Sequence, residues 1–145
     1  MNGHRANVFH VEHAHTDGDA VIHFPDANVI HTGDAMFNGM FPFIDLGSGG
    51  SVDGFIAAQS RIIDMADDDT RIIPGHGPLA SRADLVRARD MLVDARARVA
   101  ALVDEGLSED EVLERNPLAG YHDDWNWDFI TTERMTETLY RALAE

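Results

Sequence analysis

Three short segments that place a histidine or an aspartate beside glycine constrain this chain more than any other feature. They are His15-Thr16-Asp17-Gly18-Asp19, His31-Thr32-Gly33-Asp34 and Pro74-Gly75-His76-Gly77-Pro78. Glycine allows the backbone to turn sharply, so each segment can hold a polar side chain at the mouth of a site. Because the segments lie far apart in the chain, only folding can bring their side chains together. We therefore expect one site that is assembled from three loops.

The composition limits the class of protein. With 145 residues, of which 44% are hydrophobic, the chain is sized for one domain with a substantial core. No apolar run approaches the roughly 18 residues of a membrane-spanning helix, and the first residues lack the apolar segment of a secretory signal. We therefore expect a soluble protein that, as it stands, is cytoplasmic.

Charge and cysteine content narrow the chemistry. The 26 acidic residues outnumber the 11 basic ones, all of which are arginine, and the net charge of −15 argues against nucleic acid as a partner. The chain contains no cysteine, so it has neither disulfides nor thiolate metal ligands. Any metal ion must be held by histidine and carboxylate side chains.

Short runs of strand-forming residues flank the three segments. Residues 6–12, 19–24 and 28–31 predict strands, the last two joined as a hairpin by a turn at Pro25 and Asp26. Residues 33–51 contain five glycines and the apolar run Met40-Phe41-Pro42-Phe43-Ile44, which predicts a long loop that covers another part of the protein. Residues 71–73 predict a short buried strand that leads into His76.

Helical periodicity dominates the remainder of the chain. Apolar residues at helical spacing predict a helix from Val52 to about residue 66, and Ser81 caps a longer one that runs to Gly106. Ser108 begins a short helix, and a final helix starts at about Thr132. Strands followed by helices, with no internal repeat or linker, predict an α/β unit whose sheet is covered by helices on at least one face.

Three residues, His15, Asp34 and His76, are the candidate metal ligands. Each stands where a predicted strand gives way to a loop that contains glycine. A catalytic zinc site without sulfur uses imidazole and carboxylate ligands and leaves one position open for water. A carboxylate such as that of Asp34 can also bridge two metal ions. The other histidines have no such pattern, and the segment from His122 to Trp127 is interpreted as a partly exposed loop anchored by its two tryptophans, the alternative being the lining of a pocket.

This order of motifs resembles the C-terminal half of a hydrolase of the metallo-β-lactamase fold. The resemblance extends from about Val8 to Glu145 and implies a single partial domain over residues 1–145, taken from a four-layer αββα sandwich. It implies that His15 is the third histidine of a first zinc site, that Asp34 is shared between two metals, and that His76 binds the second zinc. It also places Phe37 and Asn38 beside the substrate pocket.

The resemblance implies a reaction as well. One or two zinc ions would be the cofactor, and metal-bound hydroxide would attack the ester, amide, lactone or thioester carbonyl of a small-molecule substrate. Asp34 would be the catalytic residue that orients the hydroxide or bridges the metals. Because fold does not fix the substrate, its identity stays open.

The chain departs from this family in its first half. The family's His-x-His-x-Asp-His motif is absent, and the nearest string, His13-Ala14-His15-Thr16-Asp17-Gly18, ends in glycine, so only His15 is carried over. Half of such a sandwich would expose an apolar sheet face, which predicts a homo-oligomer or a companion N-terminal half. The alternative function is a non-catalytic metal-binding or assembly module that is derived from the fold and lacks the first half of the metal site.

Overall fold

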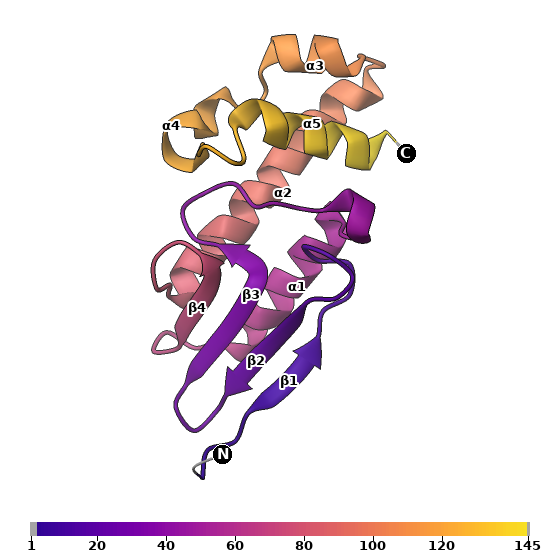
Figure 1. Ribbon diagram of the computed structural model, residues 1–145. Coiled ribbons are helices and arrows are strands. Elements are labelled where there is room, and N and C mark those ends of the chain that lie inside the picture. The colour runs from indigo at the N-terminus through magenta and orange to yellow at the C-terminus, as the bar shows by residue number, and fades with distance from the viewer. Residues whose placement is uncertain (1–2, 145) are drawn as a thin grey trace.

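The computed structural model describes residues 3–144, so Met1, Asn2 and Glu145, which begin and end the predicted domain, lie outside the described residues. Within them the chain forms a four-stranded sheet and five α-helices, arranged as in Figure 1. In chain order they are β1 (Asn7–His10), β2 (Ala20–Phe24), β3 (Val29–Phe37), α1 (Val52–Met65), β4 (Arg71–His76), α2 (Arg82–Asp104), α3 (Glu109–Arg115), α4 (His122–Trp125) and α5 (Thr132–Leu143). The predicted mixed α/β class is confirmed.

The sheet has the strand order β1-β2-β3-β4. The first three strands are antiparallel neighbours, and β4 pairs with β3 in parallel. The predicted hairpin joins β2 and β3, and its turn is closed by the Ala27 amide, which donates to the Phe24 carbonyl at 3.2 Å. Asn28 supplies the left-handed backbone of the turn with φ of 52°, a conformation that asparagine tolerates better than most residues.

Capping residues fix where the helices begin. Ser81 and Ser108 each form a capping box, with Asp84 and Glu111 respectively as the acidic partner. The Ser108 amide and hydroxyl donate to Glu111 and hold the pKa of that carboxyl below its usual range. Both helix starts that the sequence predicts are therefore confirmed.

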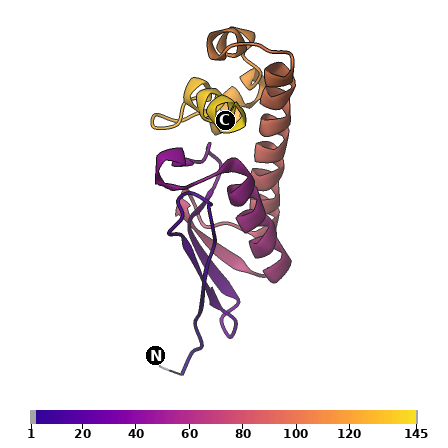
Figure 2. The ribbon, with the colours of Figure 1, turned by 90° about the vertical axis from the view of Figure 1, so that its right-hand side faces the viewer.

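Helices α1 and α2 cover one face of the sheet, as the side view in Figure 2 shows. The apolar side chains between these helices and the sheet form one buried cluster, which includes Val21, Ile30, Ile62, Ile72 and Leu85. A second buried cluster joins the loop of residues 38–51 to the C-terminal helices α2 to α5 and includes Phe41, Phe55, Leu92, Trp125 and Met135. The apolar loop predicted to cover another part of the protein thus packs beneath α5.

The other face of the sheet carries no helix among residues 3–144 (Figure 2). One row of side chains crosses the four strands there, because Val8 pairs with Ile22, Ile22 with His31, and His31 with Ile73. The two ends of this row are open to solvent: Val8 is 64% exposed and Ile73 is 38% exposed. The structure thus has the uncovered apolar sheet face that the sequence predicts.

The structure differs from the sequence-based boundaries in two places. Strand β3 continues to Phe37, whereas the sequence predicts a loop from Gly33, so the prediction of a loop over residues 33–37 is wrong. Gly33 tolerates the strand because it has φ of 53° at an irregular point in the pairing with β4. The His122–Trp127 segment begins with the short helix α4 rather than as a loop, and Trp125 within it is buried. No helix among residues 3–144 has the length and hydropathy needed to cross a bilayer.

Candidate metal centre

His15 lies in the loop that connects β1 to β2, which is tied to residues 43–51 by hydrogen bonds. The Asp45 amide donates to the His15 carbonyl at 2.9 Å, and His15 Nδ1 lies 2.8 Å from the Phe43 carbonyl oxygen. Gly50 permits this approach, because a Cβ at that position would lie 2.3 Å from the His15 carbonyl oxygen. The imidazole of His15 is therefore fixed by its neighbours and its side chain is only 15% exposed.

Asp34 lies on β3 where the pairing with β4 loses its regular register. Gly33 pairs with Pro74 and the next matched pair is Phe37 with His76, so β3 contains two more residues than β4 between these points. Such irregularities bend a strand and redirect its side chains. The redirected carboxylate of Asp34 reaches both His15 and His76.

His76 ends β4, and the glycine that precedes it makes room for Asp34. A Cβ at position 75 would lie 2.1 Å from Asp34 Oδ1 and 2.8 Å from the Gly33 carbonyl oxygen. The imidazole of His76 stacks on the ring of Phe37, with ring centres 4.7 Å apart and an angle of 11° between the planes. The side chain is half exposed, at 48%, and so faces solvent on its other side.

Asp34 lies between the other two predicted ligands. Asp34 Oδ2 lies 3.5 Å from His15 Nε2, and Asp34 Oδ1 lies 3.3 Å from His76 Nε2. Each oxygen of one carboxylate therefore faces a different imidazole. This is the arrangement that a carboxylate needs in order to stand between two cations.

The hydrogen bond to Phe43 determines which nitrogen of His15 carries a proton. A carbonyl oxygen can only accept, so Nδ1 must donate, and the lone pair of the neutral ring then resides on Nε2. That lone pair faces the carboxylate of Asp34, which also only accepts. A proton on Nε2 or a cation between the two groups satisfies both. Backbone carbonyls that fix a histidine in this way are common behind metal ligands.

The donor chemistry fits zinc, but the number of donors is small. Imidazole nitrogen and carboxylate oxygen are zinc ligands, and a catalytic site uses three protein ligands. If Asp34 bridges two ions, each ion has two protein donors from this cluster, one histidine and one carboxylate oxygen. Among residues 3–144 no group of three or more histidine, aspartate or glutamate side chains is arranged to hold one ion. The cluster thus consists of two histidine–carboxylate pairs, His15 with Asp34 and His76 with Asp34.

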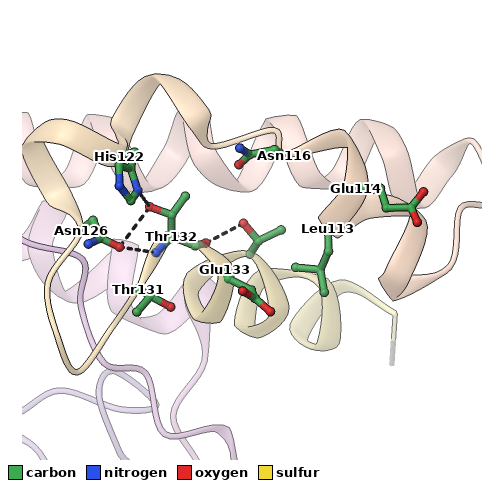
Figure 3. Close-up of a pocket in the computed structure, with 9 residues that line it drawn as sticks. Leu113, Glu114, Asn116, His122, Asn126, Thr131, Thr132 and Glu133 are labelled. Carbon is green, nitrogen blue, oxygen red and sulfur yellow. Dashed lines mark hydrogen bonds between the residues drawn. The ribbon is translucent and has the colours of Figure 1, made fainter.

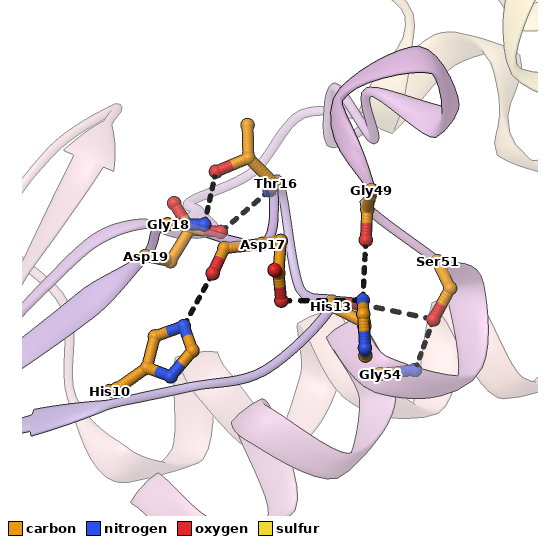
Figure 4. Close-up of polar contacts among 9 residues, drawn as sticks. All are labelled: His10, His13, Thr16, Asp17, Gly18, Asp19, Gly49, Ser51 and Gly54. Atoms are coloured by element: carbon orange, nitrogen blue, oxygen red, sulfur yellow. Dashed lines mark hydrogen bonds and ion pairs between the residues drawn. The ribbon is translucent and has the colours of Figure 1, made fainter.

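His13, two residues before His15, takes no part in this cluster. Its side chain is held by Gly49 and Asp17 (Figure 4): Nδ1 lies 2.8 Å from the Gly49 carbonyl oxygen and 3.4 Å from Asp17 Oδ1. Its backbone is in the left-handed region, with φ of 50°, and its carbonyl accepts from the Ser51 amide and hydroxyl. His13 and Asp17 secure the loop on which His15 is mounted.

Phe37 and Asn38, the predicted substrate-binding residues, lie directly beside His76. Phe37 is almost fully buried and forms the floor on which the His76 ring stacks. The Asn38 amide donates to the His76 carbonyl at 2.9 Å, and Asn38 Nδ2 donates to the Pro78 carbonyl at 3.0 Å. Both residues thus hold the His76 loop in place, and their contact with a substrate stays a prediction.

Sequence reasoning missed the aromatic side chains that surround the cluster. Phe43 contacts His15 with ring centres 5.2 Å apart, and Trp127 contacts His76 at 6.0 Å. Phe129 contacts both of these aromatic rings and is 47% exposed. The signal in the sequence was the closeness of two tryptophans and a phenylalanine, Trp125, Trp127 and Phe129. The position of Trp127 beside His76 depends on tertiary packing.

A groove of 740 Å³ lies elsewhere, between α3, α4 and α5 (Figure 3). Its polar groups mostly bond to one another: the Thr132 amide donates to Asn126 Oδ1 at 2.9 Å, and His122 Nδ1 lies 2.8 Å from the Thr132 hydroxyl. None of the three candidate metal ligands lines it. These bonds brace both ends of the loop that carries Trp127 and Phe129.

The fold and this cluster define a class of protein. The chain belongs to the metallo-beta-lactamase superfamily, whose family model matches residues 1–76. The half of the chain that matches contains all three candidate metal ligands. The resemblance inferred from the order of motifs is thereby confirmed at the level of the superfamily.

Solved structures share the fold at low sequence identity. The stereoselective inverting sec-alkylsulfatase Pisa1 from Pseudomonas sp. is 16% identical with a TM-score of 0.68, over 97% of this chain and 24% of that chain. A metallo-beta-lactamase from Pontibacter korlensis is 16% identical with a TM-score of 0.56, over 65% of this chain and 44% of that chain. TTHA1623, in a di-iron-bound form, is 25% identical with a TM-score of 0.49, over 57% and 40%. The chain spans less than half the length of each, and comparison with curated proteins gives no match.

Proposed function

We propose that this chain is the C-terminal half of a zinc-dependent hydrolase of the metallo-β-lactamase fold, with His15, Asp34 and His76 as metal ligands. One observation carries the proposal: the two oxygens of Asp34 face the Nε2 atoms of two different histidines at 3.5 and 3.3 Å. Membership of a superfamily whose members are mostly hydrolases supports it. The substrate class is a small molecule with an ester, amide, lactone or thioester carbonyl.

Different residues of the chain have different roles in such a site. Bound zinc lowers the pKa of a water ligand to about 7 and polarises a carbonyl. His15 is held in the tautomer that presents Nε2, and His76 is held by its stacking on Phe37. With metal bound, Asp34 would hold the metal or would orient a water molecule toward the substrate by accepting its hydrogen bond. The aromatic side chains around the cluster exclude bulk water from one side.

The proposal includes a source of further metal donors. With two protein donors per ion, the cluster is short of the three that catalytic zinc sites use. A second copy of the chain or a companion N-terminal half would supply the missing ligands and the missing sheet. The uncovered row from Val8 to Ile73 supports this part of the proposal.

The second candidate is a module that binds metal without catalysis. It is favoured by the finding that, in the part of the chain that the structure describes, no three acidic or histidine side chains surround one point. Zinc-dependent turnover of 4-nitrophenyl acetate or a β-lactam favours the hydrolase. Stoichiometric zinc binding without turnover favours the module.

The variant that tests both candidates is Asp34→Ala. We expect it to lose hydrolysis and most bound zinc, measured by equilibrium dialysis and elemental analysis, because it removes the carboxylate that faces both histidines. Asp64→Ala is the matched control, since Asp64 is an exposed aspartate on α1. Retention of zinc and activity by Asp34→Ala would refute the proposed site.

A further inference from the structure

A ring of side-chain contacts closes around the Asp34 cluster. Starting at His15, the successive contacts run through aromatic rings whose centres lie 5.2 to 6.0 Å apart and return through the carboxylate of Asp34. The members in order are His15, Phe43, Phe129, Trp127, His76 and Asp34. Phe37 lies below the ring and contacts His15, Trp127 and His76. We call this ring of side chains, packed on the buried Phe37, the bowl.

Trp127 and Phe129 form the wall of the bowl that lies opposite Asp34 in the ring, and this wall offers aromatic faces rather than polar groups. Phe129 is 47% exposed although it belongs to neither buried cluster. The indole N–H of Trp127 is already used, because it donates to the Phe41 carbonyl at 2.9 Å. Only the ring faces of Trp127 and Phe129 are therefore available, and such faces bind flat apolar groups.

One positive charge lies against two rings of the bowl. The guanidinium of Arg134 lies 4.5 Å from the ring centre of Phe129 and 5.4 Å from that of Phe43. Its Nη1 donates to the Phe129 carbonyl at 2.8 Å, which fixes its position.

Arg134 also differs from most arginines of the chain. Within residues 3–144 no carboxylate comes within ion-pair distance of it, although this chain carries 26 acidic residues. The guanidinium has five N–H donors, so several stay available to a ligand. A fixed cation that an acidic protein leaves without a carboxylate partner, beside aromatic faces, suits an anionic ligand with an apolar body.

From these contacts we infer that the bowl takes a substrate that joins an aromatic or other flat apolar group to an oxyanion. The apolar group lies against Trp127 and Phe129, and the oxyanion pairs with Arg134. The reacting carbonyl is then directed to the side of the bowl formed by Asp34 and the two histidines. As a statement about substrate, this inference rests on the proposed hydrolase function, whereas binding to the bowl can be measured without metal.

The test uses three small probes and the fluorescence of the full chain. Phenylacetate has both a ring and a carboxylate, 2-phenylacetamide has the ring without the charge, and acetate has the charge without the ring. The chain has two tryptophans, and Trp125 is buried at 4% exposure, so quenching that disappears in Trp127→Phe reports on the bowl. We expect saturable quenching by phenylacetate with a Kd about tenfold or more below that of either other probe.

Arg134→Met tests the charge, with Arg115→Met as a control at an exposed arginine on α3. Arg134→Met should abolish the preference for phenylacetate over 2-phenylacetamide, and Arg115→Met should keep it. Equal affinity of these two probes for the unaltered chain, or absence of saturable quenching, would overturn the inference with no variant involved. Zinc binding and ester turnover are measured separately, so a chain that binds phenylacetate but shows neither zinc binding nor zinc-dependent turnover refutes the function and leaves the bowl intact. Zinc-dependent turnover without saturable binding of phenylacetate refutes the bowl and leaves the proposed function intact.

Discussion

Substitution of Gly75 by alanine gives the most direct test of the geometry around Asp34. Gly75 lies outside the left-handed region of backbone conformation, so alanine is not excluded by its backbone angles. The obstacle is space, because the new Cβ would lie 2.1 Å from Asp34 Oδ1 and 2.8 and 2.9 Å from the oxygen and carbon of the Gly33 carbonyl. Ordinary contacts of a Cβ begin at 3.4 Å. The carboxylate must rotate away and β3 must shift.

The two displacements have different consequences. Rotation of the Asp34 side chain costs little stability but moves its oxygens away from the two histidines. Disturbances behind a metal ligand typically reduce the affinity for the metal by about 10- to 100-fold, which is about 1.4 to 2.7 kcal/mol. The shift of the backbone at Gly33 is an overpacking effect of about 1 to 3 kcal/mol. In a protein of this size that corresponds to a fall in Tm of roughly 2 to 12 °C.

The assay compares zinc affinity and thermal stability in one pair of variants. Competition with a chromophoric chelator gives the zinc Kd, and circular dichroism gives Tm. Gly120→Ala is the matched control, because a Cβ at Gly120 meets nothing within 4 Å. If folded Gly75→Ala binds zinc as tightly as the unaltered chain, Asp34 does not hold the metal in the proposed way.

Three further predictions concern stability and assembly. Asp94 accepts hydrogen bonds from the Tyr121 hydroxyl and from Arg98, which lower its pKa. The stability that this contributes is present above the unfolded pKa of about 3.9 and is lost as the pH falls through the folded pKa. Asp94→Asn should therefore lower Tm at pH 7 and differ least from the unaltered chain below about pH 4. Ser81→Ala removes the cap of α2 and should cost about 1 kcal/mol in urea unfolding, and an unchanged midpoint would contradict the capping argument. Sedimentation at decreasing concentration should show self-association that Ile73→Asp weakens, and a monodisperse monomer at every concentration would contradict association between copies.

Local chemistry explains which parts of the fold the sequence predicts. Helix starts at Ser81 and Ser108 follow from side chains that bond to nearby backbone amides, so their signal lies within four residues. The end of β3 does not follow in this way. Gly33 normally interrupts a strand, and only the pairing of β3 with β4 shows that it marks an irregularity inside one. That irregularity is also what directs Asp34 toward the histidines.

The candidate metal ligands were accessible from sequence because each carries a local mark. Asp34 and His76 stand next to glycines and His15 lies three residues before Gly18. At Gly75 and Gly50 a side chain would collide with the site. The contacts of Asp34 with both histidines show that the three segments meet, although Asp34 and His76 lie on strands rather than in loops. Their role as metal ligands stays a prediction. A motif can therefore indicate candidate ligands, but it cannot count the donors around one ion.

The wall of the bowl had no local mark, because it is produced by docking between distant segments. The Phe41 amide donates to the Trp125 carbonyl at 2.8 Å, and the Trp127 indole donates to the Phe41 carbonyl at 2.9 Å. These two hydrogen bonds hold the loop after α4 against the loop after β3. That contact determines the positions of Phe129 and Arg134. The two parts of the candidate site thus rest on different supports. Asp34 and His76 depend on the pairing of β3 with β4, and the aromatic wall depends on the attachment of the C-terminal helices to Phe41. The two supports meet at Phe43, because its carbonyl holds His15 Nδ1 and its ring contacts Phe129.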